Sequence, residues 1–293
     1  MLYKNLCIGL LLVFNMVVNS QISSLELPKG EDKIKISTVT PIVSIYVDKN
    51  NHVYLENEPI KICDIGKNLS YIRYKLPIEV QTRIKLFLYI DKNSDYNTLD
   101  DIRTQLASAH FSRLYYKTNS IEDKDVLKGI SWTNQQSFHH FSMPEKVLTK
   151  KQMEKNERLN DSLNKIFGDI PLPPPPPPPA SWFWESQHII YSDSKDAIEE
   201  ALESKTYSCV ELTNDGYKMD NGIIKFKEKD KLKNLFYSVD IVFVTFNEDL
   251  KYSNYLNAIK NYKDFENTER GYFFELSKEI VEIHKLAEIE LCN

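Results

Sequence analysis

The stretch IKLFLYIDKNSDYNTLDDIRTQL, residues 84–106, joins two patterns that together decide the fold class. Its first part is almost continuously apolar, which predicts a strand over 84–90 that is buried on both faces. A polar loop follows, and Asn97 or Thr98 is placed to cap a helix with Asp100 and Asp101 in its first turn. The helix would bury one apolar stripe: Leu99, Ile102, Leu106 and Ala109. A buried strand that leads into an amphipathic helix is typical of a sheet covered by helices.

The residues on either side complete a small domain over 41–118. Residues 41–47 and 52–55 are rich in β-branched and aromatic side chains and flank the turn DKNN, which predicts a hairpin. Apolar residues spaced three and four apart predict a helix over 65–76. A last strand is predicted over 113–118. The resulting order, β-β-α-β-α-β, predicts an α+β domain whose helices pack on its sheet.

A second domain of the same kind is predicted over 181–293. Its predicted elements are a leading helix at 194–204, a hairpin at 209–226, a short charged helix at 227–237, a buried strand at 240–246, a helix at 253–265, a strand at 272–277 and an additional terminal helix at 278–291. Tyr96 and Tyr252 hold matching positions, because each opens a helix after the loop that follows a buried strand. We interpret the two domains as a degenerate internal repeat; a chance match of two α/β segments is the alternative.

The segment between the domains, 119–180, is polar and is predicted to be a linker. It carries a charged helical pattern over 145–167 and the run PLPPPPPPP over 171–179. Consecutive prolines adopt polyproline II, so this run would span roughly 28 Å as a semi-rigid spacer. The alternative is a docking site for a proline-recognising domain. Three aromatic residues come next and either pack on the second domain or form a candidate contact patch: Trp182, Phe183 and Trp184.

The N-terminus has the pattern of an export signal. Lys4 precedes an apolar run over 6–18, and small residues stand at Val18 and Ser20, which predicts a signal peptide over 1–20. The run is shorter than the roughly 20 apolar residues of a membrane-spanning helix. An uncleaved anchor is the alternative. A polar leader is predicted over 21–40, and the mature protein is expected to be exported, to the periplasm in a bacterium, or held at the inner membrane if the segment is retained.

The charge and cysteine content exclude several classes of protein. The net charge is −5 and no basic block occurs, so binding to nucleic acid is not expected. Three cysteines remain after position 20, which is too few for a disulfide framework. Buried thiols are the expectation, with a Cys209–Cys292 pair as the alternative. No catalytic motif, cofactor-binding loop or metal-ligand spacing is present, so we expect no enzyme activity, no cofactor and no metal.

Residues 43–118 resemble the periplasmic domain of the ExbD/TolR family of biopolymer-transport proteins. The resemblance rests on VSIYVDKNNHVYLENEPIKICDIGKNL, residues 43–69, followed by the stretch at 84–106. Asn57 stands at the Asn of the family's first motif, although Glu58 replaces the usual Gly. The second motif is matched by three residues: Asp91, Lys92 and Tyr96. In the second domain the corresponding positions are Asn221, Gly222 and Tyr252.

The resemblance implies a non-catalytic role in the cell envelope. Domains of this family associate with one another, with a TonB- or Tol-type transducer protein, or with peptidoglycan. The family's transmembrane helix carries a proton-handling aspartate, whereas residues 1–20 contain no Asp or Glu, so the proton role is not carried over. We therefore expect a protein that binds envelope proteins or itself through exposed sheet edges. The alternatives are an anchored transport subunit and a secreted hydrolase of unrecognised type.

Overall fold

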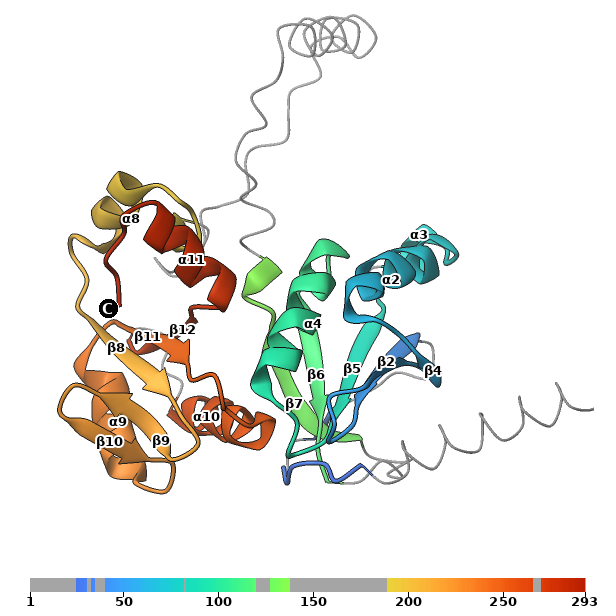
Figure 1. The fold of residues 1–293 in the computed structure, drawn as a ribbon, viewed down its shortest axis with the longest axis horizontal. Coiled ribbons are helices and arrows are strands. Elements are labelled where there is room, and N and C mark those ends of the chain that lie inside the picture. The colour runs from blue at the N-terminus through green and yellow to red at the C-terminus, as the bar shows by residue number, and fades with distance from the viewer. Residues whose placement is uncertain are drawn as a thin grey trace, which may run out of the picture.

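The computed structural model describes residues 25–30, 33–34, 40–81, 83–119, 127–137, 189–265 and 270–292. The predicted signal peptide, the charged helix at 145–167 and the proline run lie outside these residues, as does the candidate patch Trp182, Phe183 and Trp184. The described part has two mixed β-sheets with helices packed on them (Figure 1). This arrangement confirms the predicted α+β fold class.

The first sheet has the strand order β1-β7-β6-β5-β2-β3-β4. Its strands are β1 (Lys33–Ile34), β2 (Ile42–Val47), β3 (Val53–Leu55), β4 (Glu58–Pro59), β5 (Lys85–Ile90), β6 (Arg113–Lys117) and β7 (Leu127–Thr133). β2, β5 and β6 are parallel, and the remaining strands pair antiparallel on both sides of them. The helical elements are a 3-10 turn (Ile62–Asp64), α2 (Ile65–Tyr74), α3 (Ile78–Gln81) and α4 (Tyr96–Ser108).

The second sheet has the order β10-β9-β8-β11-β12. Its strands are β8 (Tyr207–Leu212), β9 (Gly216–Met219), β10 (Gly222–Lys225), β11 (Ile241–Phe246) and β12 (Tyr272–Glu275). β8, β11 and β12 are parallel, and β9 and β10 continue the sheet antiparallel. The helices of this half are α8 (Lys195–Leu202), α9 (Lys229–Ser238), α10 (Tyr252–Phe265) and α11 (Lys278–Leu286).

The two halves share one order of elements. Three antiparallel strands, a helix, a parallel strand, a helix and a parallel strand form residues 42–117, which we call module 1, and residues 207–275, which we call module 2. Each module has one more short strand than predicted, β4 and β10, because each hairpin turns back a second time. An internal repeat would produce this shared order.

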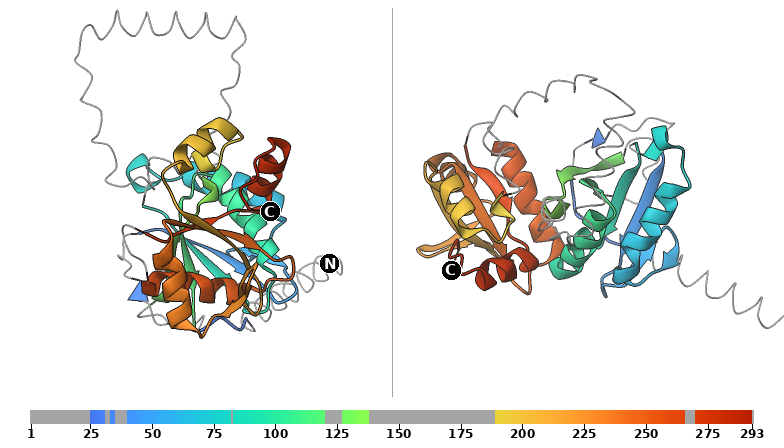
Figure 2. Two further views of the ribbon diagram at one scale, coloured as in Figure 1. Left: turned by 90° about the vertical axis from the view of Figure 1, so that its left-hand side faces the viewer. Right: turned by 90° about the horizontal axis from the view of Figure 1, so that it is seen from above.

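The modules face each other through their helices. One continuous core contains apolar residues of both sheets and of the helices between them, among them Ile102 and Leu106 of α4 and Leu256 and Ile259 of α10. α8 and α11 cover the other face of the second sheet in a separate core. The views in Figure 2 show this layering, with α4 and α10 between the sheets. The helices that the apolar stripes predicted thus join the two modules.

Two boundaries predicted from the sequence are wrong. Residues 25–30 were expected in a polar leader, but Leu27 is buried against Phe87 and Tyr89 on the face of the first sheet that α2 and α4 leave free. Residues 127–137 were expected in the linker, but 127–133 form β7 and pair with β6. Leu27 packs on strand residues that are distant along the chain, whereas β7 pairs with β6, the strand immediately before it.

Cys209 and Cys292 form a disulfide that ties β8 to the C-terminal segment. The alternative, a Cys209–Cys292 pair, is therefore confirmed, and the expectation of buried thiols is also wrong for Cys63, which is free but exposed. A bond across a sequence separation of 83 residues removes substantial conformational freedom from the unfolded chain.

We predict that reduction of this disulfide, or the double change Cys209→Ser/Cys292→Ser, lowers the free energy of unfolding by roughly 2–5 kcal/mol. Denaturant unfolding with and without reductant measures the difference. The matched control is Cys63→Ser, which removes an exposed thiol and should leave the midpoint unchanged. An unchanged midpoint in the double variant would contradict the prediction.

Candidate functional site

The two motif tyrosines bring the modules together. Tyr96 opens α4 and Tyr252 opens α10, and both are buried. The backbone N–H of Tyr96 donates to the carbonyl of Leu250 (2.8 Å), and that of Tyr252 donates to the carbonyl of Ser94 (2.9 Å). Ser94 lies two residues before Tyr96, and Leu250 lies two residues before Tyr252. Each tyrosine therefore bonds to the equivalent residue of the other module, as across the two-fold axis of a symmetric dimer. The chain therefore contains its own dimer-like interface.

Opposite charges lie at the centre of this two-fold contact. Asp95 and Lys251, which also hold matching positions, form a bridge between the modules, and their side chains make an ion pair. The ion pair lowers the pKa of Asp95. In a pair of two module 1 copies, two aspartates would meet here, and in a pair of two module 2 copies, two lysines would meet. The charges at this position favour the pairing of one module with the other.

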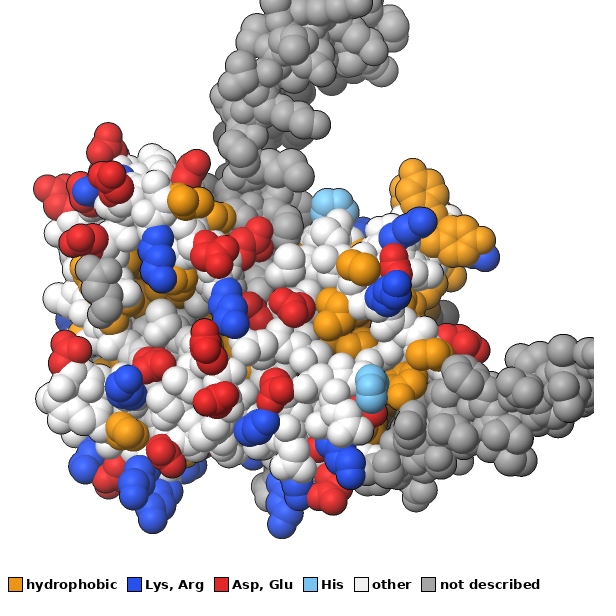
Figure 3. Space-filling view, viewed as in Figure 1, with side chains coloured by type: hydrophobic (Ala, Val, Ile, Leu, Met, Phe, Trp, Pro, Cys, Tyr) orange, Lys and Arg blue, Asp and Glu red, His pale blue; other side chains and the backbone are white. Residues whose placement is uncertain are grey.

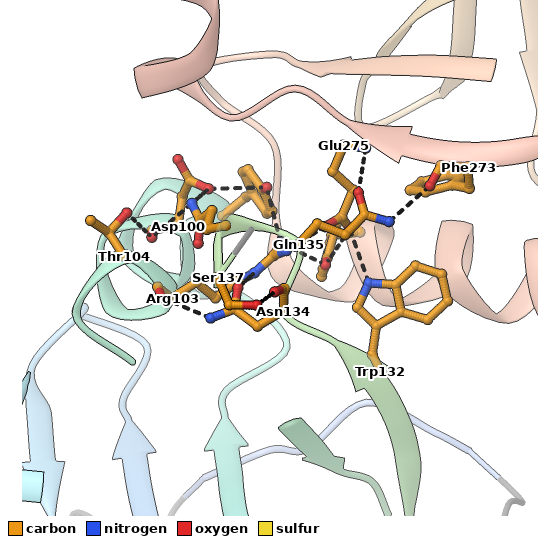
Figure 4. Close-up of polar contacts among 12 residues, drawn as sticks. Asp100, Arg103, Thr104, Trp132, Asn134, Gln135, Ser137, Phe273 and Glu275 are labelled. Atoms are coloured by element: carbon orange, nitrogen blue, oxygen red, sulfur yellow. Dashed lines mark hydrogen bonds and ion pairs between the residues drawn. The ribbon is translucent and has the colours of Figure 1, made fainter. Parts of the chain in front are cut away.

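A buried ion pair lies beside this contact. Arg103 of α4 binds Glu275 of β12, and their side chains are only 1% and 2% exposed. The guanidinium also donates to the hydroxyl of Tyr255 (2.9 Å), which donates in turn to Glu275 (2.6 Å). Figure 4 shows these groups converging from both modules. Burial opposes the charge of Arg103, but Glu275 and the surrounding tyrosines raise its pKa overall, so the guanidinium stays charged.

β7 and the segment that follows it complete this network. Trp132 donates its indole N–H to Glu275 (3.2 Å), and Asn134 accepts from the Arg103 Nε (3.2 Å). Gln135 binds the exposed edge of β12: its amide donates to the carbonyl of Phe273 (2.9 Å) and accepts from the N–H of Glu275 (2.7 Å). The side chain of Gln135 thus replaces a neighbouring strand and closes that edge.

The buried ion pair has no counterpart on the other side of the two-fold contact. Tyr116 holds the sheet position in module 1 that Glu275 holds in module 2, and Ile259 holds the helix position of Arg103. A pair of two module 1 copies would therefore bury Arg103 without a carboxylate. A buried charge without a partner is strongly destabilising. Like the Asp95–Lys251 bridge, this network favours the pairing of module 1 with module 2 over the pairing of two copies of one module.

Asp100 is a second buried carboxylate near the network. Its carboxylate accepts from the side-chain amide of Gln136 (2.7 Å) and lies 3.4 Å from the hydroxyl of Tyr96. Burial raises the pKa of Asp100 to about 6; Arg103 opposes this rise and Glu275 adds to it. With Asp100 protonated, the charges of Arg103 and Glu275 balance. Because these groups are buried, the cluster serves as a contact between modules and is closed to substrates.

The other motif residues do not gather in one place. Asp91 is buried at the end of β5, where it accepts from the backbone of Glu26, and Lys92 forms an ion pair with Glu26. These two residues hold the N-terminal segment in place. Asn57 is exposed in the turn before β4. Asn221 and Gly222 lie at the β9–β10 turn, where Gly222 has φ +132°, which disfavours other residues.

One strand edge is open in module 2 and closed in module 1. In module 1, Glu56 covers the edge of β2: its N–H donates to the carbonyl of Ser44 (2.8 Å) and its carboxylate accepts from the N–H of Ser44 (2.8 Å). Cys209 holds the position of Ser44 in β8, and Asp220 holds that of Glu56. Among the described residues, none makes the corresponding hydrogen bonds to Cys209.

This open edge borders a groove. β9 pairs with β8 only at Glu211 and Leu212, so in the part of the chain that the structure describes no strand lies beside the earlier half of β8 on that side. Strand alternation directs the N–H and C=O groups of Tyr207 and Cys209 toward the gap. A cavity of about 900 Å³ lies there, lined by β8, by the β9–β10 hairpin including Asn221, and by the C-terminal segment. The sequence alone did not reveal this site, because it depends on how far β9 runs along β8.

No family model matches the chain, and no solved structure matches it. The likeness to ExbD/TolR proteins therefore stays a prediction that rests on the motif residues. Within the described residues, no helix is long and apolar enough to cross a membrane. The same residues contain no group of three or more His, Cys, Asp or Glu side chains that could hold a metal ion.

We predict that Arg103→Met lowers the free energy of unfolding by roughly 3–5 kcal/mol, because Glu275 loses its cation while it stays buried. Adding Glu275→Gln should restore part of the loss, since the second change removes the unpaired charge. Denaturant unfolding of the two single variants and the double variant gives the coupling energy. Lys218→Met is the control, because it breaks a more exposed ion pair, with Glu211, and should cost under about 1 kcal/mol. If the losses of the two single variants simply add in the double variant, the predicted interaction between buried Arg103 and Glu275 is contradicted.

We also predict a pH dependence from Asp100. Its pKa is about 6 in the folded protein, against an ordinary value of 3.8, so the folded state holds more protons between these values. The contribution of Asp100 to the free energy of unfolding should therefore fall as the pH rises from about 4 to about 6, by roughly 2–3 kcal/mol, and then level off. Asp100→Asn should remove this fall, and the exposed Asp64→Asn should leave it in place. Unfolding curves across this range test the prediction, and identical profiles for wild type and Asp100→Asn would contradict it.

Proposed function

We propose that this chain is an exported, non-catalytic cell-envelope protein that binds other envelope proteins by strand addition at the open edge of β8. The single observation that carries the proposal is the contrast between the two modules. Glu56 satisfies the edge of β2, whereas the matching edge at Cys209 is bordered by a groove. An extended peptide supplies the same groups that Glu56 supplies, an N–H donor and an oxygen acceptor.

The contact between the modules supports binding to a different protein over self-association. The surface that two such domains would use to pair is already occupied within the chain, and its charges disfavour like-with-like pairing. The β8 edge is separate from this contact. The motif likeness to ExbD/TolR domains suggests the setting, which is a biopolymer-transport or TonB/Tol-type system in which such domains meet a transducer protein or peptidoglycan.

The disulfide supports the export part of the proposal. Disulfides form and persist in oxidising compartments such as the periplasm. N-terminal sequencing of the protein from its producing cells separates the two envelope alternatives. A mature start near Gln21 supports the exported form, and an intact N-terminus supports an anchored transport subunit.

We predict that a photo-crosslinking amino acid at Lys218, which lines the groove, captures an extended segment of an envelope protein in the producing cells. The same group at Lys67, on the exposed side of α2, is the matched control and should not capture it. Tyr207→Pro removes one N–H from the open edge and should abolish capture, while proline is tolerated at the first residue of a strand. Thermal unfolding verifies that this variant is folded. A strictly monomeric protein with no crosslink at position 218 would overturn the proposal.

A further inference from the structure

Five lysines from separate segments of the chain line one cleft. They are Lys29 in the N-terminal segment, Lys227 and Lys229 at the start of α9, and Lys260 and Lys263 on α10. Of the described residues that line the cleft, Asp264 is the one aspartate. The whole chain has a net charge of −5, so the local charge of the cleft is opposite in sign to the net charge of the protein. Figure 3 shows Lys and Arg side chains gathered at the end of the molecule that α9 and β10 form.

The cleft lies between module 2 and the chain segments that flank module 1. Module 2 contributes one face of α10 and the entry to α9, and the first half of the chain contributes Gly30, Asn119 and Ile130. Its volume is about 790 Å³. The N-terminal wall is held in place because Asn119 hydrogen-bonds through its side chain to both the N–H and the C=O of Gly30. The cleft thus forms only where the segments before and after module 1 come against module 2.

Most of this positive charge is not neutralised by the described residues. Lys260 and Lys263 donate to backbone carbonyls, of Lys29 (2.9 Å) and Ser131 (3.1 Å), which orient the ammonium groups without balancing their charge. The side chains of Lys29 and Lys227 make no hydrogen bond or ion pair with a described residue. Lys229 is the exception, because it pairs with Asp264 (2.7 Å). Clefts lined by one sign of charge concentrate ligands of the opposite sign.

We propose that this cleft binds a small ligand with several negative groups, either phosphates or carboxylates. Ammonium groups held by carbonyls form charge-assisted hydrogen bonds to either kind of oxygen. The two asparagines on α10, Asn257 and Asn261, add amide groups to the same wall, although Asn261 already donates to the carbonyl of Phe226. The described residues that line the cleft are all different from those that line the groove at β8, so this proposal can be tested independently of strand addition.

Isothermal titration with two probes tests the proposal. Tripolyphosphate represents phosphate ligands and tricarballylate represents carboxylate ligands, both at low salt, about 50 mM, where screening is weak. We expect saturable binding of at least one probe, and the probe that binds more tightly identifies the class. The triple change Lys29→Gln/Lys227→Gln/Lys260→Gln should weaken that binding by about tenfold or more.

A charge-matched control separates the cleft from the overall charge. Lys67→Gln/Lys195→Gln/Lys285→Gln removes three exposed lysines from α2, α8 and α11 and should leave the affinity within about twofold of wild type. The double change Lys29→Gln/Lys227→Gln removes no hydrogen bond to a described residue, so it replaces the triple variant if that variant fails to fold. Absence of saturable binding by both probes, or an equal loss in the control, would overturn the proposal.

Discussion

The contact of α4 with α10 and β12 is the interaction on which the rest of the structure depends. Arg103 and Glu275 are removed from water together, and each is acceptable inside the protein only because the other faces it. Tyr255, Trp132 and Asn134 satisfy their remaining hydrogen bonds, which fixes the relative position of both modules and of the segment after β7. The continuous apolar core adds stability to this contact, but its geometry is set by the polar groups.

The same contact explains why the two modules are not interchangeable. The backbone hydrogen bonds of Tyr96 and Tyr252 are reciprocal, as in a symmetric dimer. The charges beside them are not symmetric, because Asp95 faces Lys251 and Arg103 faces Glu275. Tyr116 takes the place of Glu275 in module 1, and Ile259 takes the place of Arg103 in module 2. With each module specialised for the other, the surfaces left for other molecules lie elsewhere. These are the edge of β8, which is open where Glu56 closes its counterpart in β2, and the lysine cleft between module 2 and the segments that flank module 1.

Local patterns in the sequence were sufficient to predict much of the fold. The apolar run at 84–90 and the stripe that follows it produced β5 and α4 nearly as expected, and the matching positions of Tyr96 and Tyr252 indicated two modules of one kind. The candidate site was far harder to predict from the sequence. Of the motif residues, the tyrosines lie in the contact between modules, Asp91 and Lys92 anchor the N-terminal segment, and Asn57 is an exposed turn residue. Gln135 and Asn134, which complete the contact, lie in a segment whose polar composition predicts a linker.

The sequence by itself determined the class of fold, the order of the main strands and helices, and the matching positions of the motif tyrosines in the two modules, because hydrophobic periodicity and capping act over short distances along the chain. Only the tertiary structure decided which charges meet. Arg103 and Glu275 are 172 residues apart, the disulfide joins cysteines 83 residues apart, and the lysine cleft collects side chains from position 29 to position 263. A sequence with no basic block still forms a basic cleft, because charge density depends on distance in space, which the packing of the N-terminal segment and β7 against module 2 sets.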